Sequence, residues 1–222
     1  MVRMGVKKIA LIDIDGTLVK GQTQVFLMKY LYRKKLIKTS ALLEVLFWYF
    51  KYKFLNQEID QDMAKKFYQQ LFRGKSEEEV NEIINDYFDH CLRNKIYLKS
   101  SELIKRYRDN DFEIILFSAT ISPVAKKLVE FFKADSYLST ELEIRDGKYT
   151  GLVKGGIFIG LNRAHVIRQM ICSLKKIDRI AILSDRFSDK EIFLLADEPV
   201  AINPDKKLRN FAKKENWEII DL

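Results

Sequence analysis

The stretch Asp13-Ile14-Asp15-Gly16-Thr17-Leu18 follows the apolar run Ile9-Ala10-Leu11-Ile12 and decides the fold. If residues 9–14 form a strand, the alternation of its side chains places Asp13 and Asp15 on the same side at its carboxyl end. In open α/β sheets this end of the strands is where ligands bind. Two close carboxylates repel each other unless they share a cation or a proton, so the pair predicts a divalent metal site. A strand followed by an Asx-type turn is the alternative that Asp-Gly alone allows.

The next two residues suit a turn that binds an anion. Gly16 permits a backbone bend, and Thr17 offers a hydroxyl and an amide. Together with the two acids they resemble motif I of the haloacid dehalogenase superfamily of phosphatases and phosphotransferases, which reads Asp-x-Asp-Gly-Thr after an apolar strand. The resemblance implies that Asp13 is a nucleophile and Asp15 a general acid/base. It also implies three later motifs: a Ser or Thr closing a second strand, a basic residue, and an acidic pair closing a third strand.

Ser118 matches the second motif in chain order. It closes the predicted strand 112–117, within Leu116-Phe117-Ser118-Ala119-Thr120. A hydroxyl and the neighbouring backbone amides at this position could bind the oxygens of a transferring phosphoryl group. A helix cap before Ile121 is the alternative for the same serine.

Asp185 and Asp189 follow the apolar strand predicted at 179–184 and resemble motif IV. The usual form in the related branch is Gly-Asp-Ser-x-x-Asp, whereas this chain has Ser184-Asp185-Arg186-Phe187-Ser188-Asp189. Both acids match, and the flanking Gly and Ser do not. Arg186 adds a cation beside the expected metal, which could disfavour metal binding or contact phosphate. The alternative for the acids is a strand-end residue and a helix N-terminal residue favoured by the helix dipole.

The basic motif is predicted at Arg163, which begins the predicted helix 162–174. It lies 22 residues before Asp185, a distance that suits one helix, a turn and one strand. The related branch mostly has Lys here, and Arg is not an equivalent point charge. Lys148 and Lys154 are competing candidates, and a solvent-exposed arginine is the other alternative for Arg163.

The combined resemblance implies phosphoryl transfer through a covalent aspartyl-phosphate. Asp13 would attack phosphorus, and Asp15 would protonate the leaving oxygen and then deprotonate water. Mg²⁺ would be held by Asp13, Asp185 and the main-chain carbonyl of Asp15. Asp189 would order metal-bound water. The expected phosphate contacts are Thr17, Ser118, Ala119 and Arg163.

The predicted fold class is α/β, with a Rossmann-like parallel sheet of the haloacid dehalogenase type. Helices and strands alternate from residue 98 onward, which is typical of such a sheet. Residues 20–95 contain no proline and read as four helices, so they predict an inserted bundle in the position of the family's C1 cap. Residues 1–19 and 96–222 then form the core. Its hairpin, predicted at 142–151, and closing segment resemble the phosphoserine-phosphatase-like branch.

The net charge of +8 is concentrated in the predicted cap. Residues 20–75 hold 12 Lys and Arg against 4 Asp and Glu, which alone gives +8. This region could favour phosphorylated substrates, nucleic acid or anionic lipid, and a solvated helix surface is the alternative. The aromatic residues between 47 and 52 suggest packing on other helices or the core, with a membrane-surface or partner site as the alternative.

Composition favours a cytoplasmic protein without a membrane span. No run approaches the roughly 18 uninterrupted apolar residues of a transmembrane helix. A signal peptide at the N-terminus would remove the strand that carries Asp13. Cys91 and Cys172 are far apart and lack metal-ligand spacing, so free, buried thiols in a reducing cytosol are expected.

The function predicted from the sequence is Mg²⁺-dependent hydrolysis of a small phosphorylated metabolite. Phosphoserine phosphatases of this family usually have an acid a few positions past motif I to bind the substrate's amino group. Residues 19–24 contain no acid, which argues against phosphoserine. The alternative is a catalytically weakened family member that binds nucleic acid or another anionic partner through its basic cap. Four acids in the motifs argue against this alternative, and the sequence predicts no oligomeric state.

Overall fold

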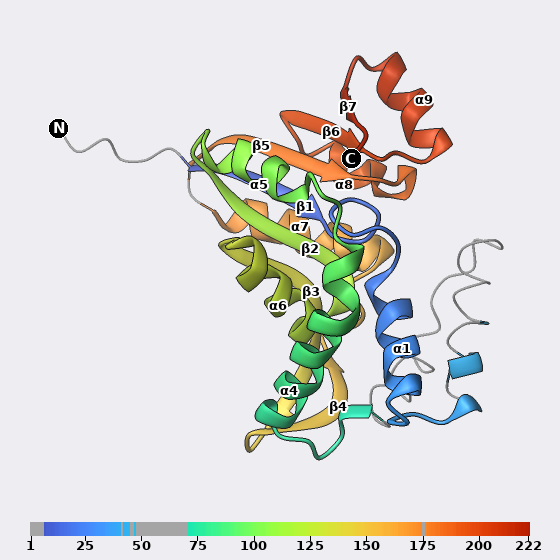
Figure 1. Cartoon of the computed structure of the whole chain (residues 1–222). Helices are drawn as coiled ribbons and strands as arrows, with labels where there is room; N and C mark the ends of the chain where they lie inside the picture. Colours follow the sequence, from blue (N-terminus) through green and yellow to red (C-terminus); the bar gives the residue numbers. More distant parts are fainter. Residues whose placement is uncertain (1–6, 41, 45–46, 48–70, 175) are drawn as a thin grey trace.

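The computed structural model describes residues 7–40, 42–44, 47, 71–174 and 176–222. The strands are β1 Lys7–Asp13, β2 Phe112–Ile121, β3 Ser136–Arg145, β4 Lys148–Lys154, β5 Ile177–Ser184, β6 Glu198–Ile202 and β7 Glu218–Ile220. The main helices are α1 Thr23–Arg33, α4 Glu77–Tyr87, α5 Ser100–Arg108, α6 Ser122–Phe132, α7 Gly160–Ser173, α8 Lys190–Phe193 and α9 Lys206–Lys214. Figure 1 shows these elements in chain order.

The strands form one seven-stranded sheet in the order β4-β3-β2-β1-β5-β6-β7 (Figure 1). All neighbouring pairs are parallel except β3 and β4, which form an antiparallel hairpin at one edge. The chain adds strands on one side of β1 and later returns to add β5, β6 and β7 on the other side. A reversal of this kind opens a crevice at the carboxyl ends of the central strands. The predicted α/β fold with a parallel sheet is confirmed.

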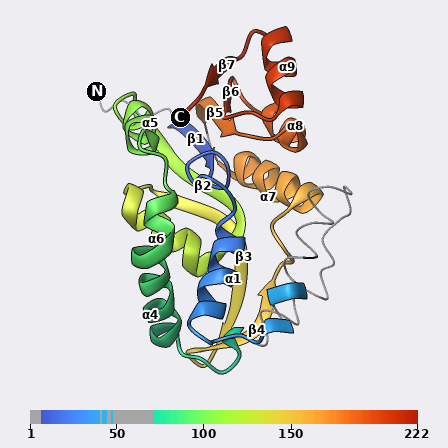
Figure 2. The same ribbon diagram turned by 45° about the vertical axis from the view of Figure 1, so that its right-hand side comes forward.

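Helices lie on both faces of the sheet (Figure 2), and alternate residues of β1 pack against the two sets of helices. Ile9 and Leu11 lie in one buried cluster with residues of α7, α8 and α9. Ala10 and Ile12 lie in a second cluster with residues of α5 and α6. Fully burying a Leu or Ile side chain stabilises the fold by about 1.5–3 kcal/mol. The alternation therefore fixes the register of β1 and, with it, the position of Asp13 at the end of the strand.

Helices α1 and α4 pack into the same cluster as α5 and α6. Leu27 of α1 and Ile84 of α4 are both almost fully buried there. Helix α4 begins with a capping box, in which the Ser76 hydroxyl accepts from the Glu79 amide and the Glu79 carboxylate accepts from the Ser76 amide. Most of the other two predicted helices of this segment, and most of the aromatic run at 47–52, lie outside the described residues, although residues 42–44, 47 and 71–72 are described and helical.

The segment 20–95 begins and ends at neighbouring points, and backbone hydrogen bonds also join it to the sheet region. The two chain connections lie side by side, because the Lys20 amide donates to the Lys95 carbonyl at 2.7 Å. Further along, Gly74 donates to the Tyr149 carbonyl at 2.8 Å, and the Tyr149 amide donates to the Lys75 carbonyl at 2.9 Å. Backbone hydrogen bonds therefore link this segment to β4 of the edge hairpin.

Three elements differ in extent from the prediction. Strand β2 does not end before Ser118 but continues to Ile121, where pairing with Thr140 of β3 resumes after an irregularity. The Thr140 hydroxyl donates to the Ala119 carbonyl at 2.8 Å and holds this extension to β3. Helix α7 begins at Gly160, two residues before the predicted start, and the Asn162 side chain, which would cap a helix that starts there, instead donates to the Ile157 carbonyl. The sequence also predicts a helix over 189–196, and the structure has only the short helix α8 there, after a 3-10 turn.

Two predictions from composition can be compared with the structure. Among the described helices, none has the length and apolar character needed to cross a bilayer. Both cysteines are free, but Cys172 is exposed and Cys91 is only partly buried. The expectation of buried thiols is therefore wrong for Cys172, which lies on the solvent side of α7.

Candidate active site

A tight turn follows β1 and carries the first two acids. Asp13 is the last residue of β1 and is 3% exposed. The turn closes because the Gly16 amide donates to the Val19 carbonyl and the Val19 amide donates to the Ile14 carbonyl, both at 2.9 Å. Gly16 has a φ of 92°, and a Cβ there would overlap the carboxylate of Asp185. Glycine is therefore required twice, for its conformation and for the close approach of an acid from β5.

The carboxylate of Asp15 is held by two donors. The Thr23 amide, at the start of α1, donates to Oδ1 at 2.6 Å. The hydroxyl of Ser118 donates to Oδ2 at 2.6 Å and accepts a hydrogen bond from the Thr120 amide at 2.9 Å. Ser118 lies within β2 and does not cap α6, which begins at Ser122. These contacts bring the turn after β1, the start of α1 and the end of β2 together.

Arg163 reaches the site from the first turn of α7. Its Nη1 lies 3.7 Å from Oδ1 of Asp13 and 3.1 Å from Oδ1 of Asp189. The guanidinium carbon lies 5.5 Å from the ring centre of Phe117 and 5.7 Å from that of Phe158. Cation–π contacts and ion pairs together fix the guanidinium beside Asp13.

The competing lysines lie elsewhere. Lys148 and Lys154 are exposed at the two ends of β4. The Arg163 side chain, in contrast, is only 12% exposed. Of the three candidates from the sequence, Arg163 is the one placed against Asp13.

The second pair of acids follows β5. Asp189 is buried, accepts a hydrogen bond from the Ser184 hydroxyl at 2.6 Å and also accepts from Arg163. Asp185 forms an ion pair with the adjacent Arg186, whose Nε lies 3.7 Å from Oδ2. Its other oxygen, Oδ1, is buried and has no hydrogen-bond partner among the described residues. Asp185 is therefore less well satisfied than Asp189.

The environment makes ionisation of two of the acids unfavourable. Burial raises the pKa of Asp13 well above its usual range, and the carboxylates of Asp185, Asp189 and Asp15 raise it further, while Arg163 opposes the shift. Burial raises the pKa of Asp185 to about 7, with Arg186 opposing and Asp189 and Asp15 adding to it. Two buried carboxyl groups with raised pKa values at one site indicate a place that a cation would stabilise.

A model of the haloacid dehalogenase-like hydrolase family matches residues 10–193 of the chain. The chain belongs to this family. The match includes all the acids discussed above as well as Ser118 and Arg163. The family predicted from Asp-x-Asp-Gly-Thr is therefore confirmed.

Two curated relatives of the family are phosphatases by name. Phosphoserine phosphatase SerB1 of Mycobacterium tuberculosis is 29% identical over 215 residues, which cover 96% of this chain and 70% of that protein. Histidinol-phosphatase of Neisseria meningitidis serogroup C is 25% identical over 223 residues, which cover 97% of this chain and 99% of that protein. The predicted phosphatase class and the phosphoserine-phosphatase-like branch are confirmed by these relatives.

Solved structures of low sequence identity share the fold. A Bordetella pertussis Tohama I protein of unknown function has a TM-score of 0.85 at 20% identity and covers 98% of this chain and 99% of its own. A phosphoserine phosphatase solved as a phospho-aspartyl intermediate analogue has a TM-score of 0.66 at 18% identity, with 98% and 94% coverage. The arrangement of sheet and helices is thus that of other family members.

The donor chemistry of the site fits a hard divalent cation. Mg²⁺ prefers oxygen ligands and usually binds through one or two carboxylates while keeping several waters. The unpartnered Oδ1 of Asp185 and the raised pKa values of Asp13 and Asp185 fit such an ion. Within the described residues, no group of three or more His, Cys, Asp or Glu side chains could hold a metal. The carboxylate of Asp15 is occupied by Thr23 and Ser118, so the main-chain carbonyl is the part of Asp15 left for such a role.

Several residues near the site were not expected from the sequence. Asn203, just after β6, donates from Nδ2 to the Gly16 carbonyl at 3.1 Å. Gln24 of α1 donates from Nε2 to the Ala119 carbonyl at 3.4 Å. Thr17, in contrast, was one of the expected phosphate contacts, and its hydroxyl is buried and has no hydrogen-bond partner in the part of the chain that the structure describes. Asn203 directly follows the apolar run Val200-Ala201-Ile202, and this position after a strand-like segment is the signal that could have identified it.

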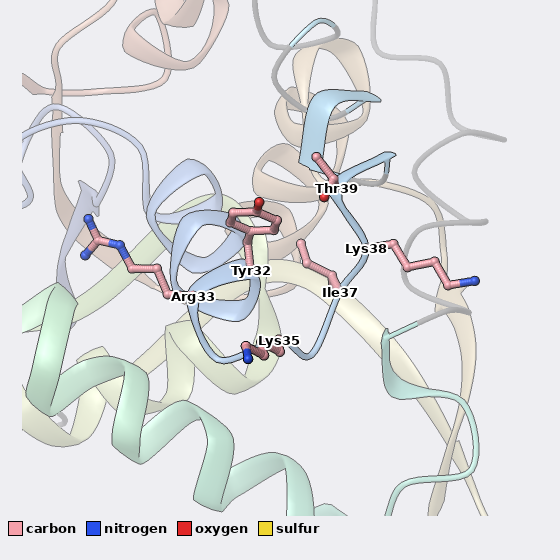
Figure 3. Close-up of a pocket in the computed structure, with 6 residues that line it drawn as sticks. All are labelled: Tyr32, Arg33, Lys35, Ile37, Lys38 and Thr39. Carbon is pink, nitrogen blue, oxygen red and sulfur yellow. The ribbon is translucent and has the colours of Figure 1, made fainter.

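A separate cavity of about 500 Å³ lies at the C-terminal end of α1, and none of the motif acids lines it (Figure 3). Its lining consists of Tyr32, Arg33, Lys35, Ile37, Lys38 and Thr39. The side chains of Arg33 and Lys38 point away from each other in Figure 3, so the cations do not converge on one anion. This cavity gives little support to the alternative in which the basic segment binds an anionic partner.

Proposed function

We propose that the chain hydrolyses the phosphate monoester of a small metabolite, with Mg²⁺ as cofactor and an aspartyl-phosphate on Asp13 as intermediate. Mg²⁺ is the general cofactor of phosphatases of this family. The supporting observation is the convergence of Asp13, Asp15, Ser118, Arg163 and Asp185 at the carboxyl ends of the central strands. These residues come from separate stretches of the chain and include every side chain that the mechanism needs.

Asp13 is proposed as the nucleophile. Its oxygen would attack phosphorus in line and displace the leaving oxygen, which forms the aspartyl-phosphate. Attack requires the ionised carboxylate, and burial opposes ionisation. Arg163, 3.7 Å away, favours the ionised form. Asp13 and Asp185 would hold Mg²⁺, which when bound supplies the positive charge that lets a phosphate dianion approach a carboxylate.

Asp15 is proposed as the general acid and base. It would give its proton to the leaving oxygen and later accept a proton from the water that hydrolyses the aspartyl-phosphate. Hydrogen bonds from the Thr23 amide and the Ser118 hydroxyl fix the orientation of its carboxylate. A fixed orientation limits the distance over which the proton must move.

Arg163 is proposed to neutralise the phosphoryl oxygens. Its guanidinium is held by Asp189, which in turn accepts from Ser184. We assign Asp189 to positioning Arg163, because both of its oxygens already have donors. The other proposed phosphate contacts are Thr17, Ser118 and Ala119.

The segment 20–95 is proposed as a cap over a core of residues 1–19 and 96–222. Helix α1 starts at Thr23, whose amide contacts Asp15, so the cap begins at the edge of the site. The first turn of α1 contains no acid. The substrate is therefore proposed to lack the amino group that an acid would bind there, which makes phosphoserine a poor candidate.

The proposal is tested by hydrolysis of p-nitrophenyl phosphate with and without Mg²⁺. Wild-type protein is expected to show metal-dependent turnover, and Asp13→Asn is expected to lose it. Asp89→Asn is the matched control, because Asp89 is exposed and pairs with Arg93 on the cap surface. Turnover that survives Asp13→Asn, or no metal-dependent turnover in the wild type, would contradict the proposal. Tight, salt-sensitive binding of RNA or DNA would instead favour the non-enzymatic alternative.

The substrate itself is best sought with a panel of phosphorylated metabolites. Phosphoserine and histidinol phosphate belong in the panel, because the two curated relatives are named for these compounds. We expect a compound other than phosphoserine to give the highest kcat/KM.

A further inference from the structure

Arg186 sets this chain apart at the metal-facing side of the site. It occupies the position where the family motif has Ser, directly after Asp185. Its Nε lies 3.7 Å from Oδ2 of Asp185, and the two side chains are 28% and 15% exposed. The guanidinium is therefore close enough to stabilise the negative charge of the carboxylate, and its partly exposed side chain reaches solvent.

The two arginines of the site serve different carboxylates. Arg163 lies between Asp13 and Asp189, at 3.7 and 3.1 Å. Arg186 pairs with Asp185, the second carboxylate proposed to hold the metal. Among the ion pairs of the described residues, each arginine therefore lies beside carboxylates with which the other does not pair.

The two oxygens of Asp185 have different surroundings. Oδ2 faces Arg186 and lies against Gly16, where a Cβ would overlap it. Oδ1 is buried and has no hydrogen-bond partner in the described residues. One oxygen thus has a cation already, and the other is suited to receive one.

We propose that Arg186 is a built-in counter-cation of Asp185, which stabilises this carboxylate in the metal-free protein and competes with Mg²⁺ for it. This inference rests on the proposed function, since it concerns the metal of the same site. A guanidinium and a divalent ion beside one carboxylate repel each other. Binding of Mg²⁺ must therefore overcome that repulsion or move Arg186 away. A serine at this position would impose no such cost.

The test compares Mg²⁺ binding by variants of the full chain, measured by isothermal titration calorimetry without substrate. Arg186→Gln removes the charge, and Arg186→Ser installs the residue of the family motif. Both are expected to bind Mg²⁺ about tenfold more tightly than the wild type, as suits one charge in a partly exposed site. Arg186→Lys should resemble the wild type. The matched control is Arg209→Gln, because Arg209 pairs with Asp221 far along the chain in α9.

Thermal unfolding gives a second readout. The neutral variants should be less stable than the wild type without metal and should gain more stability from Mg²⁺. Without metal, Arg186→Gln and Arg186→Ser should unfold at a lower temperature than the wild type, because Asp185 loses its counter-cation. Saturating Mg²⁺ should raise their Tm by more than it raises that of the wild type. A general packing defect would lower both values and would leave the Mg²⁺ affinity unchanged.

The outcomes separate this inference from the proposed function. Unchanged or weaker Mg²⁺ binding by both neutral variants overturns the inference, even if the wild type is an Mg²⁺-dependent phosphatase. Unchanged Mg²⁺ affinity with weaker binding of inorganic phosphate would also overturn it and make Arg186 a phosphate contact. Tighter Mg²⁺ binding without p-nitrophenyl phosphate hydrolysis by any variant supports the inference and overturns the proposed function. No Mg²⁺ binding by any variant overturns both.

Discussion

The acidic pair after β1 and the acidic pair after β5 follow a common pattern with one difference. In each pair one carboxylate is satisfied by donors, Asp15 in the first and Asp189 in the second. In each pair the other carboxyl group, on Asp13 or Asp185, has a raised pKa. The two groups with raised pKa values are the ones proposed to hold Mg²⁺. Each pair of acids would therefore contribute one carboxylate to the same ion.

The two pairs differ in the groups that donate hydrogen bonds to Asp15 and to Asp189. Asp15 is held by neutral groups, the Thr23 amide and the Ser118 hydroxyl. Asp189 is held by the cationic Arg163 as well as by a hydroxyl. The two acids therefore differ in charge environment, because a fixed guanidinium lies beside Asp189 whereas the Thr23 amide and the Ser118 hydroxyl are uncharged. This difference agrees with the proposed roles, acid/base chemistry for Asp15 and positioning of Arg163 for Asp189.

The largest expected effect on kcat distinguishes Asp13 from Asp185, the two acids with raised pKa values. Asp13→Asn is expected to lower kcat with p-nitrophenyl phosphate by about 10⁴-fold or more, because it removes the nucleophile. Asp185→Asn should keep measurable turnover at high Mg²⁺ and shift the Mg²⁺ dependence to higher concentration. Steady-state kinetics over a Mg²⁺ series distinguishes the two. Equal losses that Mg²⁺ does not relieve would contradict the separation.

The next largest effect on kcat is expected at Asp15 and Asp189, the two acids whose carboxylates accept hydrogen bonds. Asp15→Asn should lower kcat by about 10²–10⁴-fold and remove a limb of the pH–rate profile, because it removes the general acid. Asp189→Asn should lower kcat by about tenfold without changing the shape of that profile, because it only loosens Arg163. Measuring kcat from pH 5 to pH 9 gives both quantities. A profile altered by Asp189→Asn and not by Asp15→Asn would reverse the assignment.

Metal-free stability should depend on pH through Asp185. Its pKa in the folded protein is about 7, above the ordinary value of 3.8, so the folded state holds a proton that the unfolded state releases. The contribution of this proton to the free energy of unfolding is fully present below about pH 4 and is lost as the pH rises through 7. The loss is about 1.4 kcal/mol for each pH unit over which only the folded state holds the proton. Urea unfolding in EDTA between pH 5 and pH 8 measures this loss. Asp185→Asn should reduce the dependence and leave a residual slope of the same sign from Asp13, whose pKa is also raised, and an undiminished slope in the variant would exclude Asp185 as a source.

The smallest effect concerns the rings beside Arg163. Phe158→Leu removes a cation–π contact that is worth about 0.5–1 kcal/mol and should lower kcat/KM only a few-fold. The matched control is Phe131→Leu, because Phe131 lies on α6 with a partly exposed ring. Loss of activity as large as that of Asp189→Asn would mean that Phe158, rather than Asp189, fixes the guanidinium.

Much of the sheet could be predicted from the sequence because strand and helix periods are local properties. The motif acids also appear where strands end, which the chain order alone places at one edge of the sheet. The direction in which each acid turns could not be predicted. Asp189 turns toward Arg163, and Ser118 toward Asp15, through contacts between residues 26 and 103 positions apart. Such contacts depend on how segments pack, and local periodicity carries no information about them.

The extension of β2 and the hydrogen bond between Gly74 and Tyr149 also could not be predicted, because both depend on contacts between distant segments. Ser118 reads as the end of a strand because small polar residues follow the apolar run. Thr140 extends the strand from outside, through its hydrogen bond to Ala119. The Tyr149 contact joins a hairpin to a segment more than 70 residues earlier in the chain.

The hydrogen bond between Lys20 and Lys95 has an evolutionary consequence. The chain leaves the sheet region and returns to it at neighbouring points, so the residues between them behave as a cassette. A change in the length of the chain between α1 and α4 would leave the strand order unchanged, but the start of α1 has to stay, because the Thr23 amide holds Asp15. Recombination within the segment could therefore alter its proposed role as a cap without rebuilding the sheet.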